Sequence, residues 1–213
     1  MKTVFFGGTF DPVHNGHIQL ARGAKTALHA DRVLLTPAAA SPHKGHASAA
    51  PAADRLAMLR LATDGEPGIE ICEFELQRPP PSYTFDTIQS LRKEFPFEEF
   101  VLLIGADQLP RLHTWHRIEE LLSVVKTAVL LRQGTPIPDK PPEKILAPWW
   151  PEIKKSVLDL PEIDISATDI RQRLGKGLPI SGLVHPGVER YIYAKRLYGA
   201  VAPRRESGDG SRE

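Results

Sequence analysis

The sequence predicts a doubly wound α/β fold, in which a parallel sheet is covered by helices on both faces. Strand-like runs alternate with helix-like segments along most of the 213 residues. Runs such as 100–105 (FVLLIG) and 127–131 (TAVLL) are continuously apolar, which is typical of parallel strands buried on both faces. The chain is long enough to bury a sizeable core as one domain. Ligands of such a fold bind at the carboxyl ends of the strands.

The elements of the first half follow from their apolar patterns. Strands are expected at 3–6 (TVFF), at 32–36 (RVLLT) and, from its alternation, at 69–76 (IEICEFEL). Helices are expected from His17 to about Leu28, from Asp54 to about Thr63, and from Thr84 to Glu94. In the last of these helices Phe85, Ile88 and Leu91 share one face.

The second half contains two further strands and a long irregular segment. The strands at 100–105 and 127–131 are separated by the helical run IEELLS. Residues 38–54 are small and polar and predict a surface loop, and the proline-rich 134–151 predicts irregular chain anchored by two tryptophans. We expect one domain over 1–200, with a helical part from about 166 and a disordered tail over 201–213.

Composition narrows the class of protein. The 27 basic and 26 acidic residues nearly cancel, so nothing in the charge indicates a nucleic acid or a membrane surface as partner. The single Cys72 cannot form an internal disulfide and is expected to be a buried, reduced thiol. The sequence shows no signal-peptide pattern and no apolar stretch near the ~20 residues that cross a bilayer. A cytoplasmic protein is expected, and a homo-oligomer remains open.

The stretch GGTFDPVHNGH (7–17) predicts a phosphate site between the first strand and the first helix. Gly7 and Gly8 leave room for phosphates to approach the backbone, and Thr9 adds a hydroxyl and an amide. The helix that begins near position 16 directs its N–H groups and the positive end of its dipole there. His14 and His17 can share one helix face, because they are three residues apart. Every group in this set donates hydrogen bonds or positive charge.

This stretch also allows simpler interpretations, namely an ordinary turn or a zinc site. A Gly-Gly pair alone is more often an ordinary turn, and two histidines three apart can bind zinc only with further ligands, which Cys72 alone does not provide. The G-x-G-x-x-G fingerprint and the G-x-x-x-x-G-K-[ST] loop are both missing from the sequence. The combination of strand, glycine turn and His-x-Gly-His is more specific than any of its parts.

A second motif, ISATDIR (165–171), predicts another anion site at the start of a helix. Ser166 is a natural N-cap, and its spacing to Asp169 is that of a capping box, so a well-capped helix is the simple interpretation. Ser166, Thr168 and Arg171 nevertheless form a second group of anion-binding donors. Two helix N-termini with these side chains suit a triphosphate lying across the sheet.

The motifs together resemble the nucleotidylyltransferases of the His-x-Gly-His type and, more narrowly, the bacterial nicotinate-nucleotide adenylyltransferases. The resemblance covers roughly residues 1–200 and includes six segments in the family's order, namely GGTFDPVHNGH (7–17), SPHK (41–44), PSYT (81–84), IGADQL (104–109), TWHRIEELL (114–122) and ISATDIR (165–171). It implies a Rossmann-like fold and the reaction of ATP with nicotinate mononucleotide to deamido-NAD and pyrophosphate. It also implies Mg²⁺, which we expect the ATP phosphates to hold, with no metal-ligating residues on the protein.

The resemblance also implies roles for individual residues. Groups expected at the transferred phosphates are His14, His17, Lys44 and Arg171. Groups expected around the rest of ATP are Gly7, Gly8, Thr9, Phe10, Gly105, Asp107, Ser166 and Thr168. The nicotinate nucleotide is expected to contact Thr84, Trp115, His116 and, as a weaker phosphate candidate, Arg132. Lys44 lies in the expected loop, which we expect to be mobile without nucleotide and to close over it as a lid.

Other functions remain open at the level of sequence. A pantetheine-phosphate adenylyltransferase shares the first motif but is expected to lack PSYT and the tryptophan-containing segment. Class I aminoacyl-tRNA synthetases carry a related motif, but they are larger and need a Lys-Met-Ser-Lys-Ser-like loop. A nucleotide-binding sensor without catalysis is a third possibility, against which the intact histidines and Arg171 argue.

Overall fold

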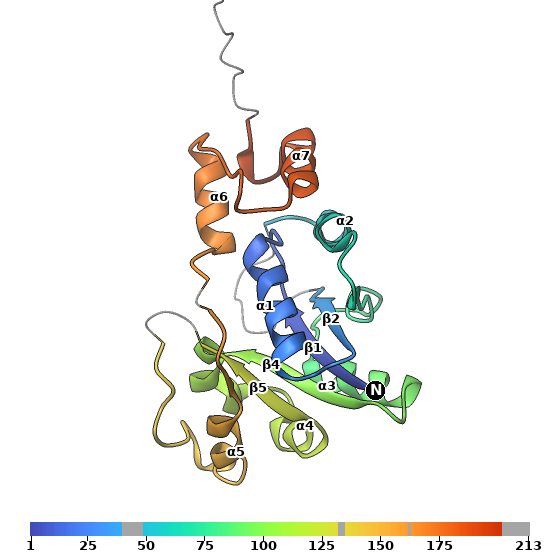
Figure 1. Cartoon of the computed structure of the whole chain (residues 1–213), viewed down its shortest axis with the longest axis vertical. Coiled ribbons are helices and arrows are strands. Elements are labelled where there is room, and N and C mark those ends of the chain that lie inside the picture. Colours follow the sequence, from blue (N-terminus) through green and yellow to red (C-terminus); the bar gives the residue numbers. More distant parts are fainter. Residues whose placement is uncertain (40–48, 132–134, 162, 202–213) are drawn as a thin grey trace, which may run out of the picture.

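A six-stranded parallel sheet forms the centre of the chain, in the strand order β3-β2-β1-β4-β5-β6 (Figure 1). The structure is a computed structural model, and it describes residues 1–39, 49–131, 135–161 and 163–201. Helices connect the strands and cover the sheet, so the predicted doubly wound, Rossmann-like α/β fold is confirmed. The strands are β1 (Lys2–Gly8), β2 (Arg32–Pro37), β3 (Ile69–Ile71), β4 (Glu99–Gly105), β5 (Lys126–Leu130) and β6 (Val157–Leu158).

The predicted helices are all present, with small shifts at their ends. The α-helices are α1 (Asn15–Ala27), α2 (Ala52–Thr63), α3 (Thr84–Glu94), α4 (Ile118–Val124), α5 (Trp150–Lys155), α6 (Ala167–Gly175) and α7 (Pro186–Lys195). Three 3₁₀ helices are η1 (Ala106–Thr114), η2 (Lys144–Leu146) and η3 (Leu197–Gly199). Helices α1 and α2 begin two residues earlier than expected, and α3 has the expected bounds.

The prediction of a strand over 69–76 is wrong beyond Ile71. The pairing of β3 with β2 ends where Ile71 lies opposite Leu35. The chain then turns, because the N–H groups of residues 76 and 77 both donate to the carbonyl of Glu73. The buried residues of this segment, Ile69, Cys72 and Glu75, lie three apart rather than in alternation, and Glu75 accepts a hydrogen bond from Thr87 of α3.

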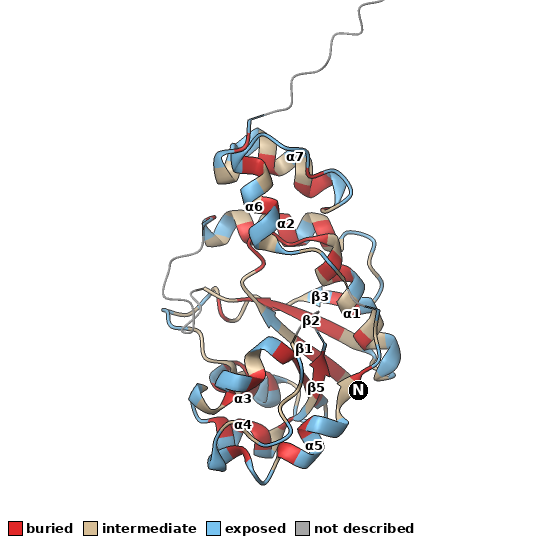
Figure 2. Ribbon diagram, turned by 90° about the vertical axis from the view of Figure 1, so that its left-hand side faces the viewer, coloured by how far each residue is buried: buried red, intermediate tan, exposed pale blue. Residues whose placement is uncertain are grey.

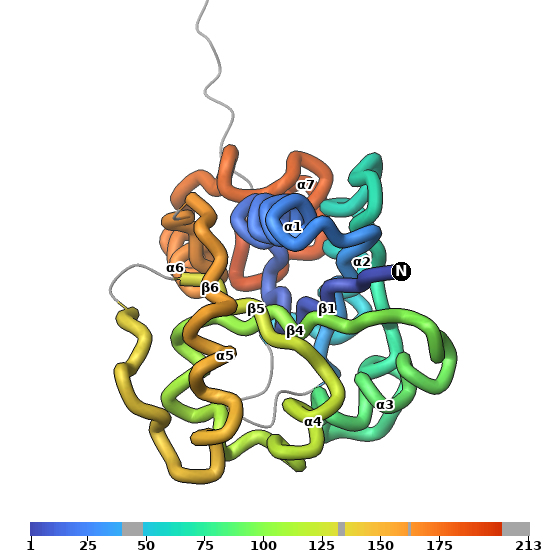
Figure 3. Tube along the Cα trace, turned by 60° about the horizontal axis from the view of Figure 1, so that its bottom comes forward, coloured from blue at the N-terminus to red at the C-terminus, as the bar shows by residue number. Residues whose placement is uncertain are grey.

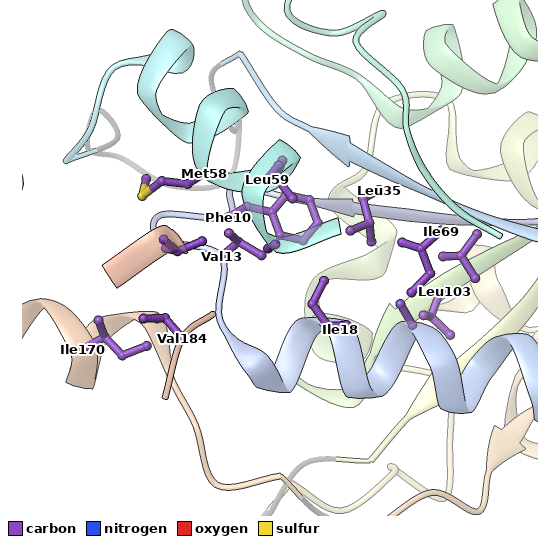
Figure 4. Close-up of a cluster of buried hydrophobic side chains, with 14 of the residues drawn as sticks. Phe10, Val13, Ile18, Leu35, Met58, Leu59, Ile69, Leu103, Ile170 and Val184 are labelled. Carbon is purple, nitrogen blue, oxygen red and sulfur yellow. The ribbon is translucent and has the colours of Figure 1, made fainter. Parts of the chain in front are cut away.

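Two hydrophobic cores lie on opposite faces of the sheet. Successive strand residues face opposite sides, so Leu35 and Leu103 pack under α1, α2, α6 and α7 (Figure 4), whereas Leu34 and Leu102 pack under α3, α4 and α5. Figures 2 and 3 show these two helical layers with the sheet between them. Burial on both faces explains why the central strands are continuously apolar in sequence.

The C-terminal helices complete the first of these cores. Ile170 and Val184 pack in the same cluster as Phe10 and Val13, beside the end of β1 (Figure 4). The chain therefore returns, after residue 166, to the loop that carries the first motif. The single domain over 1–200 stays a prediction, and the expected tail lies, after Val201, outside the described residues.

The proline-rich segment and the cysteine can be followed in the described residues. Apart from a short 3₁₀ helix, residues 135–149 have little regular structure, and Trp150 is buried at the start of α5, whereas Trp149 is only partly buried. Cys72 is a buried free thiol, as expected, and burial raises its pKa. None of the helices in the described ranges is long and apolar enough to span a membrane.

Candidate active site

The carboxyl ends of β1 and β4 separate at the centre of the sheet. Their pairing stops where Phe5 lies opposite Leu102, although β1 continues to Gly8 and β4 to Gly105. In the strand order, β1 and β4 are the two central strands, from which the chain winds outward in both directions. This switch point is where ligands bind in open α/β sheets, and the three glycines expected to contact nucleotide, Gly7, Gly8 and Gly105, lie there.

His14 and His17 form a stacked pair at the start of α1. His14 is the N-cap residue of α1, and its backbone N–H donates to Nδ1 of His17 at 3.2 Å. The two ring centroids are 3.6 Å apart, and the rings are inclined by 28°. Because Nδ1 of His17 accepts a hydrogen bond, the proton of its neutral ring lies on Nε2, which is then a donor. The structure therefore orients one N–H of His17 away from the helix backbone.

Gly16 is required by the packing of this histidine pair. A Cβ at position 16 would lie 2.9 Å from Nδ1 of His14 and 2.9 Å from the side chain of Ile163. Both distances are shorter than real Cβ contacts, so any larger residue would displace the His14 ring. At Gly8, a Cβ would lie 2.9 Å from the ring of Phe10. The glycines of the first motif thus make room for neighbouring rings within the protein.

Phe10 and Thr9 differ in how their side chains are placed. The Phe10 ring is buried in the core (Figure 4). It meets the His17 ring edge-on, with the ring centroids 5.0 Å apart. Phe10 itself has a positive φ of 49°, a conformation in which non-glycine residues are uncommon. Its side chain therefore supports His17, and only its backbone remains for the nucleotide contact that we predicted. Thr9 is partly buried.

Helix α6 brings the second motif to the same loop. The Ser166 hydroxyl accepts a hydrogen bond from the N–H of Asp169 at 3.0 Å, so the predicted N-cap is present. Arg171 donates to the carbonyl of Asp11 at 2.6 Å and to the Thr168 hydroxyl at 3.2 Å. Arg171 thus connects the start of α6 to the chain three residues before His14. The structure brings together the two clusters of donors that the sequence places about 150 residues apart.

Asp11 stabilises the loop of the first motif, and the sequence analysis missed this role. Its buried carboxylate accepts hydrogen bonds from the backbone N–H groups of Ala49 (2.6 Å) and Ala50 (3.1 Å) and from the Tyr198 hydroxyl (2.7 Å). Burial, followed by the hydrogen bond to Asp11, strongly raises the pKa of Tyr198. The bond from Tyr198 spans 187 positions of sequence, and no local pattern could have revealed it.

Arg55 is a second residue that the sequence analysis missed. Its side chain is 1% exposed, and it donates to the carbonyls of Thr9 (2.8 Å) and Ala39 (3.3 Å). Burial lowers its pKa, and the charge of Asp11 opposes this effect. The only feature of the sequence that could have indicated the role of Arg55 is a charged residue within a predicted helix. Arg55 and Asp11 hold the loop of the first motif from two sides.

Replacing Tyr198 by phenylalanine should lower the free energy of unfolding by about 1.5 kcal/mol, because the carboxylate of Asp11 loses a hydrogen-bond donor. Chemical denaturation of the full chain measures this change. The matched control is Tyr191→Phe, since the Tyr191 hydroxyl donates to Asp54, also at 2.7 Å. Tyr191 and Asp54 lie nearer the solvent, so a smaller loss is expected there. Equal losses in the two variants would contradict the structural role given to Asp11.

Thr84 and His116, two of the residues expected to contact the nicotinate group, lie at the start of α3. Thr84 is the first residue of α3. The rings of His116 and Tyr83 stack with centroids 4.4 Å apart, and Arg117 lies over the ring of Phe85 at 4.1 Å. These two contacts join the turn after η1 to the start of α3.

Trp115 and Asp107 are the remaining predicted residues that the structure describes. Trp115 is partly buried against the core under α3, α4 and α5. Asp107 is exposed in the first turn of η1, where its carboxylate accepts a hydrogen bond from the Gln108 side chain at 2.7 Å. Lys44 and Arg132 lie outside the described residues. Their roles, and the lid formed by the loop of Lys44, stay predictions.

Comparison with known proteins identifies the family of the chain. Residues 5–173 match the family described as Cytidylyltransferase-like. Proteins named "Probable nicotinate-nucleotide adenylyltransferase" from Laribacter hongkongensis and Neisseria meningitidis are 41% and 37% identical to the chain. The first alignment covers 93% of this chain and 94% of the relative, and the second covers 92% and 98%.

A solved structure shows the same fold at low sequence identity. It is the Plasmodium falciparum nicotinic acid mononucleotide adenylyltransferase complexed with NaAD, with a TM-score of 0.76 and 18% identity over 94% of this chain and 98% of that one. At this identity the likeness concerns the fold, whereas the sequence matches over nearly the full length establish the family. The chain belongs to the cytidylyltransferase-like family and, within it, to the nicotinate-nucleotide adenylyltransferases, nucleotidyltransferases of NAD biosynthesis.

Proposed function

We propose that this chain joins ATP and nicotinate mononucleotide to give deamido-NAD and pyrophosphate by direct in-line displacement at the α-phosphate. The observation that carries this proposal is the convergence of two helix N-termini, α1 and α6, with the His14–His17 pair and Arg171. All of these groups donate hydrogen bonds or carry positive charge, as binding of a polyphosphate requires.

The reaction needs no general base from the protein. The phosphate of a mononucleotide has a second pKa near ~6, so at neutral pH it is already an anionic nucleophile. Catalysis then consists of alignment of the two substrates and stabilisation of charge on the transferred group. We assign His17 to the α-phosphate, because its Nε2–H is the oriented donor of the pair. His14 fixes the ring of His17 through its backbone N–H and the ring stack.

The other contacts to ATP are part of the same proposal. Gly7, Gly8, Thr9 and the backbone of Phe10 line the phosphates, Ser166, Thr168 and Arg171 hold their far end, and Gly105 and Asp107 take the ribose or adenine side. Arg171 is bonded to the Asp11 carbonyl and to Thr168, so its guanidinium is already oriented beside the loop. Lys44 adds a positive charge when nucleotide is bound.

We propose that Mg²⁺ enters the site bound to the phosphates of ATP. Among the described residues, no group of three or more His, Cys, Asp or Glu side chains could hold a metal ion. The donor set of the site suits phosphate oxygens rather than a cation, and this fits an ion that keeps its waters and is carried by the substrate phosphates. The ion would supply neutralisation of phosphate charge, while His14, His17 and Arg171 orient the phosphates.

We place the nicotinate mononucleotide between the start of α3 and the turn after η1. Trp115 would stack on the pyridine ring, and the backbone N–H groups of Thr84 and His116 would meet its carboxylate, with Arg132 as a phosphate contact. The proposed substrates are small molecules only. The proposal also includes a cytoplasmic location, with which the buried free thiol of Cys72 agrees.

The proposal is tested by incubating the purified full chain with ATP, Mg²⁺ and nicotinate mononucleotide and measuring pyrophosphate and deamido-NAD together. Equal amounts of the two products are expected. Replacing nicotinate mononucleotide by phosphopantetheine tests the related adenylyltransferase and should give no pyrophosphate. Binding of ATP without either product would show a nucleotide sensor and would overturn the proposal.

A further inference from the structure

Glu75 is a buried carboxyl group beside the start of α3 that has no role in the reaction described above. It is 6% exposed and lies in the turn that follows β3. Its carboxylate accepts a hydrogen bond from the Thr87 hydroxyl at 3.1 Å, and Ser82 lines the same pocket as Glu75. A buried carboxyl group costs free energy unless it is fully hydrogen-bonded. Glu75 therefore constrains the position of the group that binds it.

The two hydroxyls lie on either side of the residues that begin α3. Ser82 precedes Tyr83 and Thr84, and its hydroxyl also accepts the N–H of Ala39 at 3.1 Å. Thr87 lies one turn into α3, and its hydroxyl also lies 3.3 Å from the carbonyl of Tyr83. Glu75 therefore binds the residue one turn inside the helix and lies beside Ser82, which is two residues before the helix begins.

We propose that Glu75 is a positioning residue for the pyridine nucleotide, because it binds Thr87 beside Ser82 and thereby sets the direction of the first N–H groups of α3. This inference rests on the proposed function, in which the backbone at Thr84 meets the nicotinate carboxylate. Glu75 itself does not touch the substrate. Its removal should weaken binding of the nicotinate nucleotide and leave the ATP site, at the ends of β1 and β4, little affected.

Burial and the neighbouring polar groups act in opposite directions on the pKa of Glu75. Burial raises its pKa, while Thr87, Ser82 and the charge of Arg78 oppose this rise. Arg78, Asp86 and Tyr83 are the charged or titratable groups that line, together with Glu75, a pocket of about 280 Å³. The Thr87 hydroxyl has a single hydrogen, which it directs toward the Glu75 carboxylate. Glutamine has the same shape, and its side-chain oxygen can accept the same hydrogen.

Steady-state kinetics of Glu75→Ala and Glu75→Gln test the proposal. Glu75→Ala should raise the KM for nicotinate mononucleotide about tenfold, equivalent to about 1.4 kcal/mol, and change the KM for ATP less than about twofold. Glu75→Gln should restore the KM for nicotinate mononucleotide to within about threefold of the unmodified chain. The matched control is Glu73→Ala, because Glu73 lies on the same turn but pairs with Arg60 of α2 at 2.6 Å.

Thr87→Val provides a second variant that removes only the hydroxyl, should Glu75→Ala fail to fold. It should also raise the KM for nicotinate mononucleotide selectively. Equal rises in the two KM values, or a Glu75→Gln variant as impaired as Glu75→Ala, would overturn the positioning role. Failure of the proposed function is seen separately, since the unmodified chain would then form no deamido-NAD at all.

Discussion

Replacement of His17 by alanine is expected to lower kcat by about 100-fold or more, while the KM for ATP changes little. The reason is the oriented Nε2–H of His17, which results from the hydrogen bond between its Nδ1 and the His14 backbone. Charge on the transferred phosphate increases as the transition state forms, so a donor placed there contributes more to the transition state than to the ground state. Such an interaction affects kcat rather than KM.

One further variant separates donation of a hydrogen bond from proton transfer. His17→Gln keeps an N–H near the position of Nε2 but cannot exchange protons at neutral pH, so it should recover part of the lost activity. His29→Asn is the matched control, because His29 is exposed beyond the far end of α1 and has a positive φ, which asparagine tolerates.

The dependence of the rate on pH gives an independent check of His17. Ionisation of the substrate phosphate near pH ~6 should remain visible in both the unmodified chain and His17→Ala. An unchanged kcat with only a raised KM for ATP would contradict the assignment. Loss of the pH dependence in His17→Ala would indicate that His17 acts as a base.

The sheet could be predicted from sequence because its pattern is local. Continuous apolar runs gave four strands directly, and burial of both faces, seen for Leu34 and Leu35, is the physical cause of that pattern. The segment 69–76 was assigned wrongly because the alternation of apolar residues continues beyond the end of the strand. After Ile71, where β3 ends, the buried residues are Cys72 and Glu75, which lie three apart and so do not follow the two-residue period of a strand. The two-residue strand β6 is too short to carry a pattern.

Donor groups of the candidate site could also be predicted, whereas the residues that hold them could not. The two histidines and Arg171 belong to compact motifs whose residue types indicate phosphate binding. Asp11, Arg55 and Glu75 act through hydrogen bonds to partners such as Tyr198 and the carbonyl of Ala39, which are distant in sequence. Such partners become visible only when the fold is known. For Arg55, the sequence gives only an arginine within a helix.

The second large expected effect is a preference of about two orders of magnitude in kcat/KM for nicotinate mononucleotide over its amide. Tyr83, the N-cap of α3, makes no side-chain capping bond to the backbone within the described residues. The first N–H groups of α3 therefore remain as donors at the positive end of the helix dipole. A carboxylate can accept from several of them, whereas a carboxamide would turn an NH₂ donor toward a donor. An unsatisfied buried polar group costs ~1–3 kcal/mol, and the lost charge-assisted bond adds to this cost.

A nearby cation does not account for this preference. Arg117 directly follows His116, so its guanidinium lies close to the proposed pocket. It lies over the ring of Phe85, and its Nε and Nη2 both donate to the carboxylate of Glu120. Its charge is thus already compensated by Glu120. Discrimination should therefore depend on the backbone donors of α3, which no side-chain truncation removes.

Thr84→Pro tests these backbone donors directly, with Thr84→Ala as its matched control. Proline is well tolerated at the first position of a helix, and Tyr83 has the extended conformation that a following proline requires (φ −103°, ψ 128°). Thr84→Pro removes one N–H and the hydroxyl, whereas Thr84→Ala removes the hydroxyl alone. The ratio of kcat/KM for the acid to that for the amide should fall about tenfold further in Thr84→Pro than in Thr84→Ala, since one charge-assisted bond is lost. Equal ratios in the two variants, or comparable kcat/KM for both nucleotides in the unmodified chain, would contradict this pocket and leave the assignment of His17 untouched.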